Sequence, residues 1–397
     1  MFVTVERSAP TPPTEATMSV PHHPIAIIGG GLGGLVAARV LHVHGIEAAV
    51  FDLESGPEAR TQGGMLDIHE ESGQRALRAA GLYDGFRAIV HPGGEALRLA
   101  GPDGTVLVDI ADDGSGGRPE VDRGALRDLL LASLPDGTVR WGRKVTGARP
   151  LGDGRHEVAF ADGSAVTTGL LIGADGAWSR IRPLVSAARP AYTGISFVET
   201  DLHDADTRHP RGAALVGGGS FMCLGDERGI LAHRETDGSL HVYTALKAAE
   251  NWLGTVDFAD PALAKKAVLA HLEGWHEDLR GLVAEAVTVT PRHIHALPVG
   301  HRWERTPGVT LLGDAAHLMS PFAGEGANLA LQDGAELALA LAAHPGDVES
   351  ALARYEEALF PRGRAAAAES ADNLRDMFAP DGLRRMAGFF ASHPGAA

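Results

Sequence analysis

The stretch Ile25-Ala-Ile-Ile-Gly-Gly-Gly-Leu-Gly-Gly34 decides the fold of this chain. Residues 25–28 form a short apolar run that predicts a buried strand, and the apolar-periodic residues 35–44 behind the glycines predict a helix that Gly45 ends. Residues 47–51 then predict a second strand. Strand, glycine turn, helix and strand make a βαβ unit, so we predict an α/β fold with a parallel sheet.

Gly29, Gly31 and Gly34 satisfy the pattern G-x-G-x-x-G at this turn. In a dinucleotide-binding fold the first glycine allows a tight turn, the second lets a pyrophosphate approach the backbone, and the third packs helix against strand. Asp52 closes the second strand, where an acid accepts hydrogen bonds from a ribose 2′-hydroxyl. A purely structural glycine turn is the alternative. The context favours a Rossmann-like site for FAD or NAD. The acid at Asp52 disfavours a 2′-phosphate, and hence NADP, bound at this site.

The composition excludes some classes of protein and disfavours one class of partner. Glycine supplies 51 of the 397 residues, about 13% against a usual ~7%, which indicates many tight turns or close backbone contacts with a ligand. Hydrophobic residues make up 44% of the chain and there is no Gly-X-Y period, so collagen-like and disordered chains are excluded. Lys and Arg number 35 against 51 Asp and Glu, and the net charge of −16 disfavours a nucleic-acid partner.

The cysteine content and the N-terminus indicate a compartment. Cys223 is the single cysteine, so no intrachain disulfide can form, which fits a reducing environment. No apolar run reaches the ~18 residues of a membrane span, and residues 1–23, rich in Pro and Thr, lack the pattern of a signal peptide. We therefore expect a cytoplasmic protein without membrane contact, with a disordered extension over residues 1–23.

Patterns along the chain predict a second domain inserted into the first. Buried strands at residues 170–172 and 309–312 extend the first sheet, and β-runs at 95–110 and 140–166 are predicted as antiparallel excursions from it. Residues 191–297 alternate β-branched and polar types around one helix-like stretch, which predicts a mainly β substrate domain.

The predicted dinucleotide-binding domain therefore comprises residues 24–190 and 298–345, on either side of the substrate domain. The end of the chain is helical, with one helix predicted at 348–372 and a separate one near 373–390. We expect these C-terminal helices, within residues 346–397, to bridge the two domains.

Two later motifs also follow predicted strands. One is Gly173-Ala-Asp-Gly176, followed by Ser179 and Arg180, and the other is Gly313-Asp-Ala-Ala-His317, followed by Pro321, Gly324, Gly326 and Asn328. Either could be no more than a capped strand-to-helix turn. With all three glycine motifs in this order, the sequence resembles the class A FAD-dependent aromatic monooxygenases, typified by p-hydroxybenzoate hydroxylase, over about residues 24–390.

The resemblance implies bound FAD and a set of cofactor contacts. Carried over, these contacts are Gly29, Gly31, Gly34, Asp52, Arg60, Asp67, Arg123, Asp175, Asp314, Pro321, Gly324, Gly326 and Asn328. Arg60 would be the contact associated with the nicotinamide cofactor, unless it only pairs with Asp52 or Glu58. The alternative for Arg123 is a surface ion pair with an acid before the helix that it opens.

Several segments look like the tetracycline-inactivating monooxygenases of that family. They are Glu58-Ala-Arg60, Gly63-Gly-Met-Leu-Asp-Ile-His69, Ser72-Gly-Gln74, Asp201-Leu-His203, Leu240-His241, Asp314-Ala-Ala-His-Leu-Met319, Pro321-Phe-Ala-Gly324 and Asp376-Met-Phe-Ala-Pro-Asp381. By this likeness the substrate cavity would be lined by Glu199, Ser220, His241, Pro321, Gly324 and Met377. His241 could instead be a buried histidine with an internal partner, and Met377 could simply fill the domain junction.

This chain departs from the family pattern at several positions. Asp52-Leu53 stands where the family more often has Glu-Arg, which keeps the acid but loses a cation near the adenosine. Ser320 and Glu325 stand where proline and glutamine are commoner beside the flavin, and Glu199 and Ser220 stand where a glutamine and an arginine recognise tetracycline. Such changes alter which oxygen atoms a pocket can bind. We therefore expect a polycyclic aromatic or polyketide-type substrate, among which a tetracycline-like antibiotic is one candidate.

The resemblance also implies the reaction. NAD(P)H would reduce the flavin, O2 would add at C4a, and the resulting hydroperoxide would hydroxylate the substrate, so the flavin carries the chemistry and no catalytic side chain is predicted. NADPH is favoured over NADH by resemblance only, and we expect a monomer with no metal. The alternatives are an FAD-dependent reductase or dehydrogenase of the same fold, which inserts no oxygen, and a non-catalytic flavin- or drug-binding protein.

Overall fold

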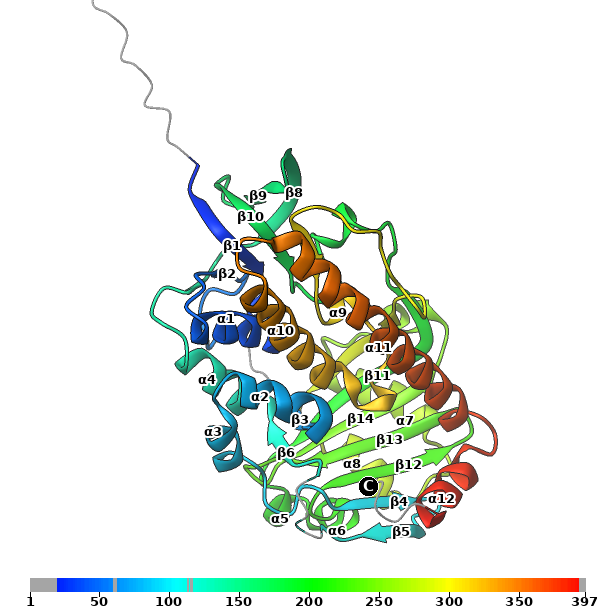
Figure 1. Cartoon of the computed structure of the whole chain (residues 1–397). Coiled ribbons are helices and arrows are strands. Elements are labelled where there is room, and N and C mark those ends of the chain that lie inside the picture. The colour runs from blue at the N-terminus through cyan, green and yellow to red at the C-terminus, as the bar shows by residue number, and fades with distance from the viewer. Residues whose placement is uncertain (1–19, 60–62, 113, 115–116, 393–397) are drawn as a thin grey trace, which may run out of the picture.

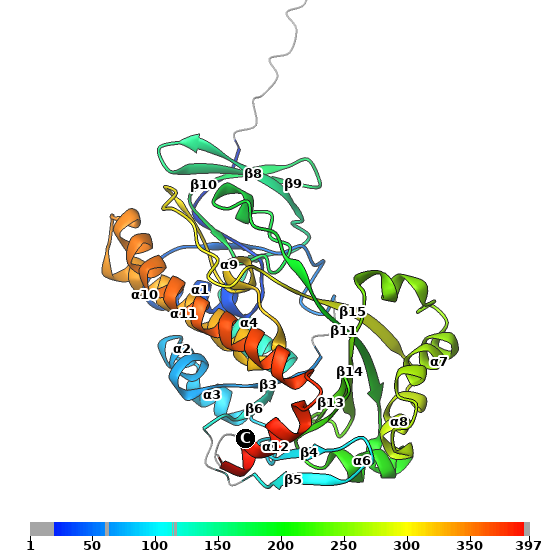
Figure 2. The same ribbon diagram turned by 90° about the vertical axis from the view of Figure 1, so that its right-hand side faces the viewer.

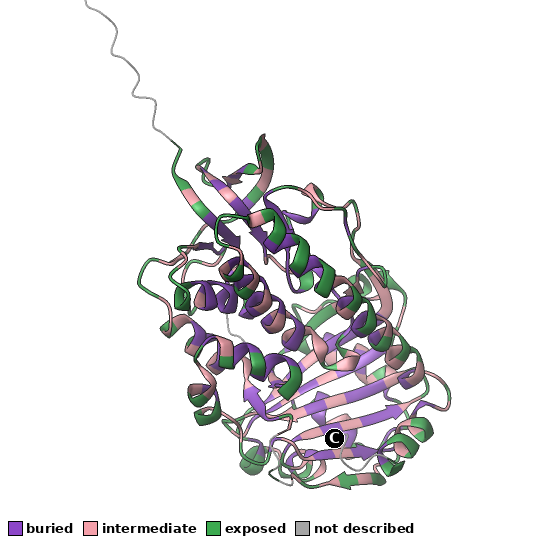
Figure 3. Cartoon of the chain, viewed as in Figure 1, coloured by how far each residue is buried: buried purple, intermediate pink, exposed green. Residues whose placement is uncertain are grey.

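The computed structural model describes residues 20–59, 63–112, 114 and 117–392. Within these ranges it contains two seven-stranded sheets and one two-stranded sheet, with long helices running from the first large sheet toward the second (Figure 1). The buried residues follow the strands of both large sheets and the helices between them (Figure 3). The predicted α/β fold class is confirmed.

The first sheet is built around the predicted βαβ unit. Its strand order is β7-β2-β1-β10-β9-β8, with β16 also beside β10. The strands are β1 His22–Ile28, β2 Ala49–Phe51, β7 Val139–Arg140, β8 Val145–Gly152, β9 Arg155–Phe160, β10 Ala165–Gly173 and β16 Val309–Leu311. β1 pairs in parallel with β2 and β10, and β10 pairs in parallel with β16, whereas β8 and β9 are antiparallel. β1 begins at His22, inside the predicted extension, whose residues 1–19 lie outside the described ranges.

Two helices pack directly on each other behind the glycine turn. They are α1 Leu32–Val43 and α10 Glu325–Ala343. A Cβ on Gly334 would lie 2.3 Å from the carbonyl oxygen of Gly33, so the two backbones come closer than any other residue would allow. α1 consequently includes two glycines and begins before the predicted residue 35, because tertiary packing overrides the low helix propensity of glycine.

The second sheet has the order β15-β11-β14-β13-β12-β4-β5. Its strands are β4 Leu97–Ala100, β5 Val106–Ile110, β11 Ala191–Leu202, β12 Ser220–Gly225, β13 Arg228–Arg234, β14 Leu240–Lys247 and β15 Val289–Ala296. The prediction for residues 95–110 is wrong: β4 pairs in parallel with β12, so this segment belongs to the second sheet and not to the first. Local β patterns do not encode which sheet edge a strand joins.

Helices cover the outer face of the second sheet, and their buried side chains form a hydrophobic core together with those of the sheet. They are α5 Ala205–Arg208, α6 Pro210–Val216, α7 Pro261–His271 and α8 Glu277–Ala284, so the single helix predicted between residues 191 and 297 is an underestimate. Cys223 is buried in this core. No helix within the described ranges has both the length and the apolar character needed to cross a membrane.

The C-terminal helices run beside both large sheets (Figure 2). α11 Val348–Met377 is one continuous helix, so the predicted break after residue 372 is wrong. It packs on α10 and on the turn Pro321–Ala323, and Met377 is buried against the second sheet. α12 Gly382–Ser392 then packs on β5 and β12.

Shorter elements fill the junction between the sheets. The strands β3 Met65–Asp67 and β6 Glu120–Asp122 pair with each other. The helices here are α2 Arg75–Ala79, α3 Tyr83–Ala88, α4 Arg123–Ala132 and α9 Asp314–His317.

Candidate functional site

The first glycine turn leaves an open space at the N-terminus of α1. Gly29 has φ +108°, and a Cβ there would lie 2.3 Å from the carbonyl oxygen of Ala174, while a Cβ on Gly34 would lie 2.1 Å from that of Gly29. A Cβ on Gly31 would meet nothing within 4 Å. Gly29 and Gly34 are therefore fixed by protein contacts, whereas the space at Gly31 suits a phosphate group at a helix N-terminus.

Asp52 lies at the end of β2 next to this turn. Its carboxylate is buried and accepts hydrogen bonds from the backbone N–H groups of Gly30, at 2.6 Å, and Glu54, at 2.8 Å. A carboxylate has about four acceptor positions, so Asp52 can still accept a ribose hydroxyl. Arg60, predicted beside it, lies outside the described residues.

Asp175 holds its own loop together. One oxygen accepts the Ser179 hydroxyl at 2.5 Å, and the other accepts the Arg180 N–H at 2.6 Å. The buried Arg182 then ties this loop to the next motif, since it donates to the carbonyl oxygens of Ala177 and Ala315, each at 2.8 Å. Asp175 thus shapes the turn against which Gly29 packs.

A buried ionic cluster holds the Gly313–His317 motif in place. The fully buried Asp333 on α10 accepts hydrogen bonds from Gly313 N–H at 2.9 Å, His317 Nε2 at 2.6 Å and Arg362 at 2.9 Å. Burial alone lowers the pKa of His317, but Asp333 more than offsets this and raises it. Sequence reasoning missed Asp333 and Arg362, because neither stands near a motif whose spacing marks it.

Asp314 is the accessible carboxylate of this motif. Its side chain is exposed, yet surrounding protein raises the pKa of its carboxyl by burial, an effect that the cations His317, Arg123 and Arg182 oppose. Arg123 is in turn fixed at the start of α4, where its N–H donates to the carbonyl oxygen of Gly64 at 3.1 Å. The carboxylate of Asp314 is thus reachable from solvent although protein surrounds it, and it can accept a hydrogen bond from a hydroxyl group of a bound ligand.

The turn before α10 joins several predicted contacts. Asn328 donates from Nδ2 to the carbonyl oxygens of Asp67, at 2.8 Å, and Gly324, at 3.3 Å, and its Oδ1 accepts the N–H of His69 at 2.9 Å. Gly324 has φ +68°, and a Cβ there would lie 3.3 Å from Asp67 Oδ2. A Cβ on Gly326 would meet nothing within 4 Å, so open space lies beside this turn as well.

The predicted substrate residues meet on one face of the second sheet. Asp201, His241, His233 and Ser220 lie opposite one another across β11, β14, β13 and β12, and the next row contains Glu199, Tyr243, Leu231 and Met222. Directly opposed residues share a face, so these eight residues form what we call the inner face. A Cβ on Gly64 would lie 3.2 Å from the Tyr243 hydroxyl, and the ring of Phe322 lies 5.8 Å from that of Phe197 on β11. The inner face is therefore turned toward the glycine motifs.

The polar row of the inner face mixes charged and neutral imidazoles. His241 Nδ1 donates to Asp201 at 2.5 Å, and although burial alone lowers the pKa of His241, this contact raises it. Burial lowers the pKa of His233 to about 4, and its Nδ1 lies 3.2 Å from the Ser220 hydroxyl. The protonated form is therefore favoured at His241, whereas His233 beside it is neutral near neutral pH.

Glu199 and Met377 are less available for contact with a substrate than the sequence predicts. Arg292 on β15 pairs with Glu199 at 2.5 Å, and only 11% of the Glu199 side chain is exposed. Met377 is buried with Phe378 and Phe197 in one apolar cluster. Glu199 thus presents a neutralised carboxylate, while Met377 closes the apolar end of the same face.

A separate groove of about 360 Å³ lies between α11 and the ends of β11, β14 and β15. It is lined by apolar side chains such as Ile195, Leu297, Leu374 and Phe378, with Lys247 and Arg375 among its polar residues. Among the predicted cofactor and substrate residues that the structure describes, none lines this groove, so the site is defined by the motif contacts above.

Comparison with known proteins decides the family. Residues 22–370 match the family model described as FAD binding domain. This chain belongs to that family. The chain is also 31% identical to monooxygenase asqM of Emericella nidulans, over 86% of this chain and 92% of the relative. It is 31% identical to a 3-amino-4-hydroxybenzoate 2-monooxygenase of Streptomyces platensis, over 92% and 91%.

Solved structures agree with this family at the level of the fold. Klebsiella pneumoniae HpxO complexed with FAD and uric acid matches with a TM-score of 0.74 at 23% identity, covering 94% of this chain and 92% of its own. Tetracycline destructase Tet(51) matches with a TM-score of 0.69 at 18% identity, covering 94% and 96%. At such identities the likeness shows the fold alone.

The protein is therefore an FAD-dependent monooxygenase, as the resemblance to class A flavin monooxygenases predicted. FAD is its cofactor, and NAD(P)H and O2 are the co-reactants typical of this class. The residues fit this cofactor, because the glycine turns leave open space at Gly31 and at Gly326 and the carboxylate of Asp314 is accessible.

Proposed function

We propose that this monooxygenase hydroxylates a polycyclic aromatic or polyketide-type small molecule on the inner face. The observation that carries the proposal is the layout of that face, a polar row of Asp201, His241, His233 and Ser220 beside a second row that is apolar at Leu231 and Met222. Spanning four strands at ~4.8 Å spacing, it extends about 14 Å, longer than one aromatic ring. Tyr243, Leu231 and Met222 form its half-buried floor.

The relatives support an aromatic or heteroaromatic substrate of this kind. The Streptomyces relative is named for a benzoate, HpxO was solved with uric acid, and Tet(51) is named for tetracycline. These ligands differ in size, so the inner face of this chain is what favours a substrate with several rings. A tetracycline-like antibiotic stays one candidate, although Glu199 and Ser220 present different groups from those predicted for tetracycline recognition.

The proposed cofactor contacts divide into three groups. The N-terminus of α1 at Gly31 would bind the pyrophosphate, with Asp52 on the adenosine ribose and Arg60 near the nicotinamide cofactor. Asp314 and Arg123 would hold the middle of FAD. The turn with Pro321, Gly324, Gly326 and Asn328, with Asp67 behind it, would lie against the flavin ring. FAD, when bound, supplies the redox chemistry.

The side chains of the inner face have binding and orienting roles. His241 would hold a substrate oxygen that carries negative charge, because its contact with Asp201 favours the protonated imidazole. Met377 and the aromatic cluster around it would exclude water at the apolar end. We also propose that the protein acts as a monomer.

A substrate panel tests the proposal. The purified FAD-loaded protein is incubated with NADPH or NADH, in air, with a tetracycline, an anthracycline-type polyketide or a simple phenol. Products are scored by mass for the gain of one oxygen. We expect a polycyclic compound to gain oxygen. Oxygenation of the simple phenol alone would overturn the substrate class, and NAD(P)H-dependent reduction without added oxygen would favour the reductase alternative.

A further inference from the structure

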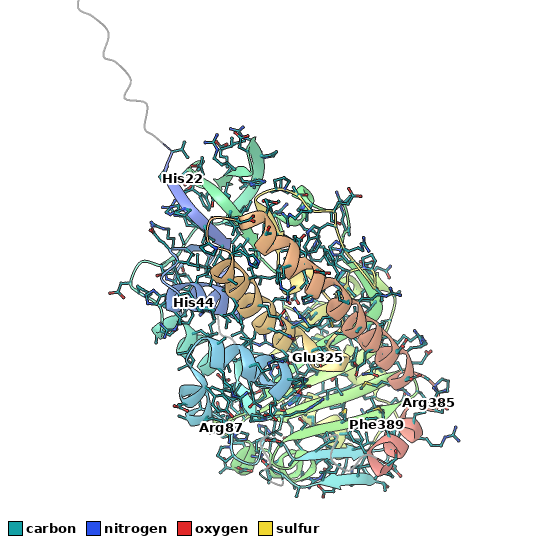
Figure 4. The ribbon with its side chains drawn as sticks, viewed as in Figure 1. His22, His44, Arg87, Glu325, Arg385 and Phe389 are labelled. Atoms are coloured by element: carbon teal, nitrogen blue, oxygen red, sulfur yellow. The ribbon has the colours of Figure 1, made fainter. Side chains whose placement is uncertain are left out.

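His69 is a buried histidine that lies between two carboxylates beside the Gly324–Asn328 turn, which we call the flavin turn because it is proposed to contact the flavin ring. Only 1% of its side chain is exposed. Its Nε2 lies 2.8 Å from Asp67 Oδ2, and its Nδ1 lies 3.3 Å from Glu325 Oε1, an ion pair without the alignment of a hydrogen bond. Glu325 opens α10, at the point in Figure 4 where this helix approaches the second sheet.

The backbone around His69 is joined to the same turn. The N–H of His69 donates to Asn328, and Asn328 donates in turn to the carbonyl oxygens of Asp67 and Gly324. Three proposed FAD contacts are thus linked to His69, Asp67 through the imidazole, and Asn328 and Gly324 through the backbone N–H of His69 and the Asn328 amide. Sequence reasoning missed His69, and its signal was the departure at Glu325, where relatives of this kind more often have a neutral glutamine.

We propose that His69 is held as an imidazolium between Asp67 and Glu325, and that this cation positions the Gly324–Asn328 turn for FAD binding. The inference rests on the proposed cofactor contacts at this turn and not on the identity of the substrate. His69 is a positioning residue, since it acts through Asp67, Glu325 and Asn328.

The surrounding charges fix the protonation state. Burial alone lowers the pKa of His69, but its contacts with Asp67 and Glu325 raise it to about 9. Arg118, whose guanidinium lies 3.9 Å from Asp67 Oδ2, opposes this rise, and the buried Glu120 on β6 also faces the imidazole. Burial raises the pKa of Glu120 well above its usual value, which favours its neutral form beside the imidazole.

If His69 loses its proton, the positive charge between the carboxylates of Asp67 and Glu325 disappears. Because the pKa in the folded protein is raised, the stabilisation is complete below the unfolded value near 6.5 and is lost as pH rises through about 9. Above that pH, Asp67 and Glu325 would face a neutral ring, and the turn would be held less firmly. FAD binding should then weaken in alkali.

The test measures the dissociation constant of FAD by flavin fluorescence from about pH 6 to about pH 10, without substrate. In the wild-type protein we expect a break near pH 9, above which binding weakens by at most about tenfold per pH unit because one proton is linked. In Glu325→Gln the break should move to lower pH. In His69→Gln binding should be weaker near pH 7 and the break should disappear.

His156→Gln is the matched control. His156 is also buried, on β9 of the first sheet, and burial lowers its pKa, so it does not gain or lose a proton near pH 9. This variant should keep the wild-type break. Titration of the flavin itself affects all variants alike.

Two results would overturn the proposal. One is a break that stays in place in Glu325→Gln, and the other is a His69→Gln protein that binds FAD more weakly by one constant factor while the break persists. If His69→Gln fails to fold, Glu325→Gln decides alone. Since no substrate is present, a failed substrate panel leaves this outcome unaffected.

Discussion

The first glycine turn and the inner face use different means to prepare a binding site. The turn uses backbone: Gly29 and Gly34 are fixed by contacts that a Cβ would break, and Gly31 leaves a space that a ligand can fill. The inner face uses side chains brought together by strand register, such as Asp201 and His241. Backbone sites are encoded in short motifs, whereas side-chain sites depend on which strands pair. The turn should therefore respond to an added methyl group, and the inner face to a change of charge.

The largest effect is expected at Gly34. In Gly34→Ala the new Cβ would lie 2.1 Å from the Gly29 carbonyl oxygen inside the packed turn, which cannot yield without moving β1. We expect a loss of about 3 kcal/mol or more in the free energy of unfolding, measured by urea denaturation. Gly388→Ala in α12 is the control, because its Cβ meets nothing within 4 Å and should leave stability unchanged or slightly higher. Equal stabilities in the two variants would break the distinction between fixed and open glycines.

Gly31→Ala separates ligand binding from folding. Its Cβ would enter open space and its φ is −78°, so the protein without FAD should keep its stability. The methyl group would occupy the space proposed for the pyrophosphate, and we expect FAD binding to weaken about tenfold or more, measured by flavin fluorescence. Unchanged FAD affinity in this variant would show that the cofactor does not approach the backbone at Gly31.

Asp201→Asn tests the inner face through its charge. Asp201 raises the pKa of His241, so its loss should lower that pKa, and the cationic His241 should disappear at a lower pH. We expect KM for an identified substrate to rise about tenfold near pH 8 while kcat changes less, seen as an acid shift of the KM–pH profile. Asp257→Asn, an exposed acid of the same part of the chain, should leave the profile in place. An unshifted profile in Asp201→Asn would separate this pair from substrate binding.

The smallest effect is expected at Ser370. Its buried hydroxyl donates to the Ser320 carbonyl oxygen at 2.6 Å and lies 2.6 Å from the Ser320 hydroxyl, which ties α11 to the residue just before the turn Pro321–Ala323. Ser370→Ala should lower the free energy of unfolding by about 1 kcal/mol in thermal or urea denaturation. The exposed Ser350 on the same helix offers a matched alanine variant that should lose less. Equal losses would mean that this contact adds nothing to the hold on the turn.

The sequence predicts the backbone part of the molecule best. The βαβ unit, the parallel partners of β1 and the turns at Gly29, Gly313 and Gly324 all follow from short local patterns. Where a pattern is local but its partner is distant, prediction fails. Residues 97–110 look like any hairpin, and only the pairing of β4 with β12 places them in the second sheet.

Long-range partners explain the remaining differences. The break predicted after residue 372 ignored the packing of Met377 and Phe378 on the second sheet, which carries α11 onward. The unusual Ser320 and Glu325 could be noticed in the sequence, but their partners Ser370 and His69 lie far away along the chain. Similarly, nothing near Glu199 indicates that Arg292 neutralises it.

Isotope-labelled O2 tests the central claim most directly, namely that this FAD-dependent monooxygenase inserts oxygen into a polycyclic substrate held on the inner face. The FAD-loaded protein is supplied with NAD(P)H, labelled O2 and the best substrate from the panel, and the product is analysed by mass spectrometry. We expect one labelled oxygen atom in each product molecule, with one NAD(P)H consumed for each. A product that is reduced or dehydrogenated and carries no label would contradict it.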